Sequence, residues 1–108
     1  MSNVTLIPLP FTVVLMRGYR FQDIPNWEGE PETDTYTAHV RAHTKQDAVR
    51  LAKQEAIDAD NGSLNQTLGA KFVRALRLDK GDYDFLVLFE GHQHVKAWGW
   101  QTGPWQHE

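Results

Sequence analysis

The sequence predicts an α+β domain with a largely antiparallel sheet of three to four strands and one main helix, at about residues 44–60, packed on one face. Three observations support this class. Residues 34–42 alternate apolar and polar side chains, as a half-buried strand does. The next segment has the spacing of an amphipathic helix. Residues 85–89, FLVLF, are apolar throughout, which is typical of a strand covered on two sides. At 108 residues, we expect a single domain spanning 1–108.

The first strand is predicted at residues 11–16, where FTVVLM combines β-branched and aromatic side chains. Pro8 and Pro10 precede this run. Because proline cannot donate to a ladder, we expect both to lie outside the strand. Residues 23–34 combine two prolines, a glycine and acidic side chains, which predicts a long exposed loop.

The main helix has recognisable start and stop signals. Thr44 and Asp47 form a capping-box-like start, and Asn61-Gly62 is typical of a helix end. One arc of this helix carries mostly small apolar side chains and should pack on the sheet. Its members are Ala48, Val49, Leu51, Ala52, Ala56 and Ala59.

The segment between the helix and the last strand is ambiguous. Residues 63–70 are predicted as a loop, and residues 71–78 fit neither the helical nor the strand period. A strand is favoured because residues 79–82, DKGD, are a turn signal just before FLVLF. The two flanks could therefore form an antiparallel hairpin.

Composition excludes several classes of function. Eleven basic and fourteen acidic residues give a net charge of −3, which disfavours general binding of duplex nucleic acid. The absence of cysteine excludes disulfides and thiolate zinc sites and suits a reducing cytosol. The apolar start of the chain is broken by prolines and lacks a leading basic region, so neither a signal peptide nor a membrane segment is expected. We expect a cytoplasmic protein.

His92 and His94 are the best candidates for metal ligands, because residues two apart on an extended chain share a face. A metal centre needs a third ligand. The candidates for that ligand are Glu90, His39, His43, His107 and Glu108. No third ligand is fixed by spacing, so no metal or other cofactor is expected. A His-ligated metal-dependent enzyme is kept as an alternative.

The aromatic segment near the end of the sequence, AWGWQTGPW, allows two interpretations. Trp98 and Trp100 share a side of an extended chain, and one of them is expected to close the core, while Trp105 is the ring expected to stay exposed. The alternative is a protein that binds single-stranded nucleic acid by stacking bases on these rings. Basic side chains that would then follow the phosphates are Lys96, Arg74 and Arg77.

No complete catalytic constellation is present: the sequence lacks a G-x-S-x-G elbow, a G-x-G-x-x-G loop and a Walker loop. The stretches DTYTAHVRAHTKQDAVRLAKQEAIDADNG and DYDFLVLFEGH, within residues 34–92, resemble small α+β proteins of bacterial phages, plasmids and other mobile elements. The resemblance implies no activity. Together these points favour a non-enzymatic accessory protein that binds a host or phage protein.

A candidate binding surface follows from side chains that the predicted core does not use. Ile57 points away from the apolar arc of the helix and is expected at the surface beside Arg50 and Lys53, where it could form a contact patch. Trp27 in the acidic loop and Trp105 in the aromatic segment are large rings available for a partner. The predicted surface comprises Trp27, Arg50, Lys53, Ile57 and Trp105.

Overall fold

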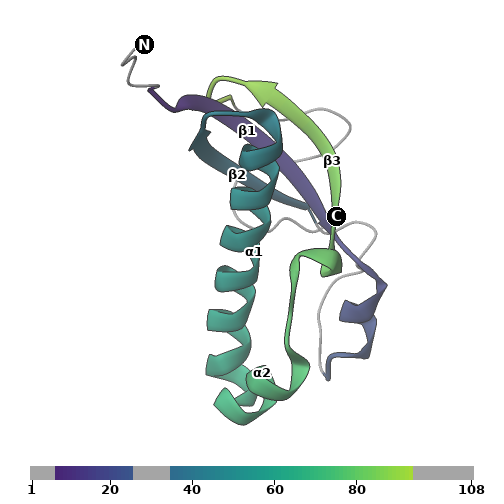
Figure 1. Ribbon diagram of the computed structural model, residues 1–108. Helices are drawn as coiled ribbons and strands as arrows, with labels where there is room; N and C mark the ends of the chain where they lie inside the picture. Colours follow the sequence, from purple (N-terminus) through teal and green to yellow (C-terminus); the bar gives the residue numbers. More distant parts are fainter. Residues whose placement is uncertain (1–6, 26–34, 94–108) are drawn as a thin grey trace.

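A computed structural model gives the fold of the chain and describes residues 7–25 and 35–93. Three strands form one antiparallel sheet in the order β2-β1-β3, and the long helix α1 packs on one face (Figure 1). The elements of this core are β1 (Leu9–Arg17), β2 (Thr35–Ala42), α1 (Lys45–Leu68) and β3 (Tyr83–Glu90). The predicted α+β class with an antiparallel sheet and one main helix is confirmed.

The central strand β1 begins at Leu9 and includes Pro10, so the expectation that both prolines lie outside the strand is wrong for Pro10. Pro10 is tolerated because it sits near the end of the strand, where its carbonyl still accepts a hydrogen bond from the Gly91 N–H at 2.9 Å. A short 3₁₀ helix, η1 (Tyr19–Asp23), follows the strand.

The predicted alternation of β2 is confirmed on its core face. The side chains that pack toward α1 are Tyr36, Ala38, Val40 and Ala42. On the opposite face His39 and Arg41 are exposed, as expected, whereas Thr35 and Thr37 are buried.

Helix α1 starts as predicted but extends further. The Thr44 hydroxyl accepts a hydrogen bond from the Asp47 N–H at 3.0 Å, which caps the first turn. The helix does not end at Asn61-Gly62 but continues to Leu68. It ends before Gly69, whose φ of 91° few other residues adopt. The longer helix is stabilised by Leu64, which is buried in the core cluster.

Residues 70–76 form a second helix, α2 (Ala70–Leu76), so the predicted loop over residues 63–70 and the favoured strand over residues 71–78 are both wrong. The apolar side chains of α2 are spaced to pack against the core beside the far end of α1. They are Phe72, Val73 and Leu76. The DKGD segment forms a short 3₁₀ helix, η3 (Lys80–Asp82), rather than a hairpin turn, and β3 pairs with β1 instead.

Two different faces of α1 are buried along its length. In the first half Ala48, Ala52 and Ala56 pack on the sheet, as predicted. In the second half, the end of which reaches past the sheet in Figure 1, Ile57 and Leu64 are buried instead. The prediction that Ile57 lies at the surface is wrong: this side chain is 6% exposed. None of the described helices is long and apolar enough to cross a membrane.

Candidate interaction surface

Helix α1 lies mainly over β2 and β1 and covers less of β3 (Figure 1). A helix is about 10 Å wide and neighbouring strands are about 4.8 Å apart, so one helix covers roughly two strands. A hydrogen bond of 2.5 Å from the Tyr36 hydroxyl to the Glu55 carboxylate joins α1 to the outer strand β2. The third strand, β3, therefore carries the less covered part of this face.

Two apolar side chains of β3 point to the α1 side of the sheet. Phe85 pairs with Leu15 and Leu88 pairs with Val13, and both partners belong to the core under α1. A bulge adds Leu86 to β3, which is why residues three apart share a face. Leu88 packs against the core and is partly buried, but Phe85 is 47% exposed.

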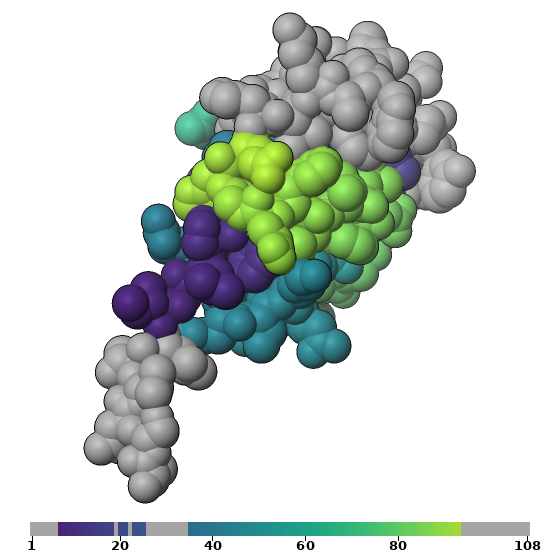
Figure 2. Space-filling view, turned by 90° about the horizontal axis from the view of Figure 1, so that it is seen from above, coloured from purple at the N-terminus to yellow at the C-terminus, as the bar shows by residue number. Residues whose placement is uncertain are grey.

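A hollow of about 450 Å³ lies at the end of the sheet where α1 begins. Figure 2 shows the start of β1, the start of α1 and the end of β3 side by side in this region. The lining includes Leu9, Phe11, His43, Thr44, Lys45 and Glu90. Glu90 pairs with Phe11, so it lies on the same face as Phe85 and Leu88. The hollow and Phe85 thus mark the two ends of one strip.

Two lysines of α1, Lys53 and Lys45, lie near this strip. Lys53 precedes Asp60 by seven residues, or about two helical turns, so both point the same way. The Asp60 carboxylate accepts a hydrogen bond from the Tyr83 hydroxyl of β3 at 2.8 Å, which fixes that side as the one facing β3. Lys45 lines the hollow. We call Phe85, Leu88, Lys45, Lys53 and the hollow the β3–α1 surface.

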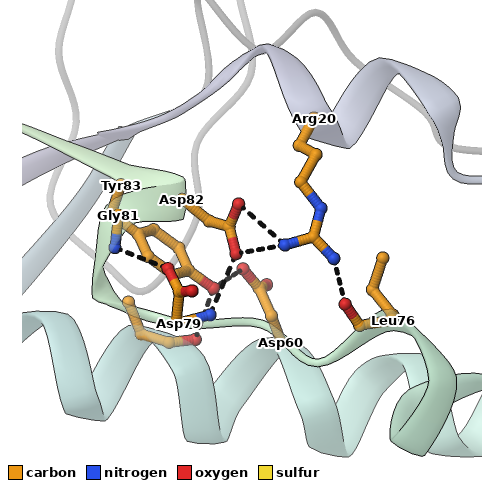
Figure 3. A network of polar contacts seen from close by, with 8 residues as sticks. Arg20, Asp60, Leu76, Asp79, Gly81, Asp82 and Tyr83 are labelled. Carbon is orange, nitrogen blue, oxygen red and sulfur yellow. Dashed lines mark hydrogen bonds and ion pairs between the residues drawn. The ribbon is translucent and has the colours of Figure 1, made fainter.

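A cluster of polar side chains lies inside the molecule, and Figure 3 shows two of them, Asp60 and Tyr83. The Arg17 guanidinium donates to both Asp60 oxygens, at 2.6 and 3.2 Å, and Tyr83 donates to the same carboxylate. Burial is the main cause, and the Asp60 charge the second, of a strong rise in the pKa of Tyr83. The cluster joins β1, α1 and β3. Because its side chains are buried, a substrate does not reach them in this structure.

A second, partly exposed ion pair lies beside it in Figure 3. Arg20 of η1 donates to both oxygens of Asp82, at 3.1 and 2.9 Å, and also to the carbonyl of Leu76 at the end of α2. Asp82 further accepts a hydrogen bond from the Asp79 N–H at 2.9 Å. These contacts fasten η1 and α2 to the segment that leads into β3, which is a structural role.

The chain after β3 crosses the other face of the sheet. Gly91, with φ of 83°, begins this crossing. The Thr12 hydroxyl donates to the Gly91 carbonyl at 2.7 Å and accepts from the Gln93 N–H at 2.8 Å. His92 and His39 then hydrogen-bond backbone carbonyls through Nε2, His92 to Val40 at 3.1 Å and His39 to Gln93 at 3.0 Å. Residues 91–93 are therefore bound to both β1 and β2.

These contacts involve His92, one of the two candidate metal ligands. The rings of His39 and His92 lie 5.3 Å apart, and each Nε2 contacts a carbonyl. Residues 7–25 and 35–93 hold no group of three or more side chains able to bind a metal ion. His94 lies outside these residues.

Of the predicted binding residues, the structure describes Arg50, Lys53 and Ile57, all on α1. Arg50 is exposed, with its guanidinium 3.6 Å from Asp47, and Lys53 is partly buried on the flank that faces β3. Ile57 is in the core and cannot contact a partner. The remaining predicted aromatic residues lie outside the described residues: Trp27, Trp98, Trp100 and Trp105. The segment required for base stacking lies there too, although Arg74 and Arg77 are exposed.

Phe85 and the partly buried Leu88 were not among the predicted binding residues. The available signal was that FLVLF is apolar on both faces while the sequence predicts one main helix.

A comparison of the chain with protein-family models, with curated proteins and with solved structures finds no match.

Proposed function

We propose that this chain is a non-enzymatic accessory protein of a phage or mobile element, and that it acts by binding a protein of the host or of the phage through the β3–α1 surface. The observation that carries this proposal is Phe85, an aromatic side chain 47% exposed beside Leu88 on the part of the sheet that α1 covers least. Aromatic side chains in such positions dominate many protein interfaces.

The energetics favour a partner for this surface. Completing the burial of a large apolar side chain contributes up to about 1.5–3 kcal/mol. Because Phe85 is 47% exposed, about half of that contribution is missing in the isolated chain. The hollow near Glu90 extends the surface and offers a concave site for a side chain of the partner.

The polar clusters support binding rather than catalysis. A catalytic group must reach its substrate, whereas Arg17, Asp60 and Tyr83 are almost completely buried. The better exposed pair, Arg20 and Asp82, is engaged in contacts that hold η1 and α2 in place.

Affinity capture from a bacterial lysate, followed by mass spectrometry, tests the proposal. The bait is the full chain, compared with the variant Phe85→Ser. The matched control is Ile7→Ser, because Ile7 is a second exposed apolar residue, 76% exposed, and lies before β1. We expect a protein that is retained by the wild type and by Ile7→Ser but lost with Phe85→Ser. Circular dichroism must show that all three baits are folded.

Two results would contradict the proposal. Recovery of chaperones alone would show that the bait attracts no specific partner. A specific partner that binds Phe85→Ser as well as the wild type would place the interface elsewhere on the molecule.

A further inference from the structure

Resting on the proposed function, we infer that the occupant of the β3–α1 surface is an amphipathic helix of the partner, between two and three turns long, which lies beside α1 over β3. Its apolar side chains contact Phe85 and Leu88, and its acidic side chains face Lys45 and Lys53. This goes beyond binding as such, because it specifies the structure, length and charge of the partner segment.

The spacing of the layers favours a helix. Packed helices lie about 8–10 Å apart, or about two strand spacings. With α1 over β2 and β1, a neighbouring helix at that distance lies over β3. An extended segment added to the edge of β3 would pair its backbone but leave the α1-side face of Phe85 uncovered. A helix covers this face.

The length of the surface sets the length of the helix. From Phe85 to Glu90 the strand advances four register positions, Leu15 to Phe11 on β1, because Leu86 is the bulge residue. Four positions span about 13 Å at roughly 3.3 Å per residue. At about 1.5 Å per residue, a helix of that length has roughly nine residues, or between two and three turns. Its apolar side chains should recur every three or four residues.

The positions of Lys45 and Lys53 predict where the acidic side chains of the partner helix lie. Lys45 and Lys53 are eight residues apart, which places them about 12 Å apart along the axis of α1. Two acidic side chains seven or eight residues apart on the partner helix match this spacing. Glu90 lines the hollow from the β3 side, so acidic groups are favoured on the α1 side of the partner helix and disfavoured over β3. Asp84 does not oppose this arrangement, because its pairing with Met16 places it on the other face of the sheet.

Selection from a library of random 14-residue peptides, displayed on ribosomes and bound to the full chain, tests the inference. We expect enriched peptides with an apolar stripe of helical period and a flank of Asp or Glu, which become helical in circular dichroism when the protein is added. Affinity should fall by about tenfold or more for Phe85→Ser, as for an aromatic residue central to an interface.

The charge prediction has its own control. Lys53→Glu should weaken binding of the same peptides a few-fold, and exchanging for lysine only the acidic residue that faces position 53 should restore it. Lys71→Glu, an equal change of charge at an exposed position of α2, should leave the affinity unchanged.

The possible outcomes separate this inference from the proposed function. Enriched peptides that alternate apolar and polar residues and depend on Phe85 would overturn the helix but leave protein binding in place. A library without enriched peptides, or with peptides insensitive to Phe85→Ser, would also overturn the helix. Affinity capture from the lysate tests the proposed function independently of the peptide selection.

Discussion

Arg17 of β1 and Asp60 of α1 form a buried ion pair, with Arg17 Nη2 2.6 Å from Asp60 Oδ1 and side chains 4% and 1% exposed. The guanidinium also lies 5.3 Å from the centre of the Phe21 ring, which adds a cation–π contact. Taking two charges out of water is costly, and the pair is compensated by several hydrogen bonds and by this ring. It holds the end of β1 against the second half of α1.

Removing one partner of this pair should destabilise the protein strongly. Asp60→Ala would leave the Arg17 charge buried without its carboxylate, and we expect the free energy of unfolding to fall by about 3–5 kcal/mol. Chemical denaturation measures this change. The control is Asp58→Ala, which removes an exposed carboxylate from the same helix and should cost less than about 0.5 kcal/mol.

The double variant Arg17→Met with Asp60→Leu completes the test. Because it removes both charges and keeps apolar volume, it should be more stable than Asp60→Ala. If Asp60→Ala unfolds at the same denaturant concentration as the wild type, the pair has no stabilising role.

Local signals predicted the parts of the fold that depend on a single element and its immediate neighbour. The alternation of residues 34–42 was sufficient for β2, because one face of this strand packs against α1 along its whole length. The capping contact between Thr44 and Asp47 was likewise visible in sequence, because it involves residues three apart.

The predictions failed where a helix or strand packs against different neighbours along its length, or against one distant in sequence. The helical period predicts one buried face when one surface covers the helix. The end of α1 extends past the sheet, and the second half of the helix buries Ile57, which a single arc assigns to solvent, and Leu64, which lies beyond the predicted end of the helix. The hairpin prediction failed for a related reason, since the partner of β3 is β1, about seventy residues earlier in the chain, and no turn signal reports that pairing.

The candidate surface could be predicted in part. That FLVLF needs cover on both faces was readable from sequence. That Phe85 is the side chain left exposed depends on the strand order β2-β1-β3 and on the bulge at Leu86, and both are properties of the assembled sheet.

Thr12 should contribute more to stability than an ordinary surface threonine. Its hydroxyl bonds the Gly91 carbonyl and the Gln93 N–H, and the side chain is fully buried. Thr12→Val keeps the shape but leaves two backbone groups without this partner, so we expect a loss of about 1–3 kcal/mol. Thermal unfolding measures it. Thr67→Val removes an exposed hydroxyl from α1 and should change stability little.

Hydrogen exchange at Gln93 provides a second measurement for this contact. Loss of the Thr12 hydroxyl should speed exchange of the Gln93 amide while amides in the middle of α1 keep their protection. Unchanged exchange at Gln93 in a folded Thr12→Val variant would show that the hydrogen bond is not formed in solution.

Alkaline pH should destabilise the protein through its buried tyrosines. Burial, together with the nearby charge of Asp60, raises the pKa of Tyr83 far above its ordinary value of about 10. Burial and the hydrogen bond to Glu55 raise the pKa of Tyr36 in the same way. The folded state therefore keeps these protons at a pH where the unfolded state releases them. Their contribution to stability is fully present below about pH 10 and is lost as the pH rises above it.

The expected loss is about 1.4 kcal/mol per pH unit for each such tyrosine above pH 10. Denaturant unfolding of the wild type at a series of pH values from about 8 to 11 measures the slope. Tyr83→Phe should be less stable at neutral pH, since it loses the hydrogen bond to Asp60, yet its stability should fall less steeply with pH. Tyr36→Phe should reduce the slope by a similar amount. If the slope of Tyr83→Phe equals that of the wild type, the Tyr83 hydroxyl titrates normally in the folded protein, and its burial beside Asp60 is wrong.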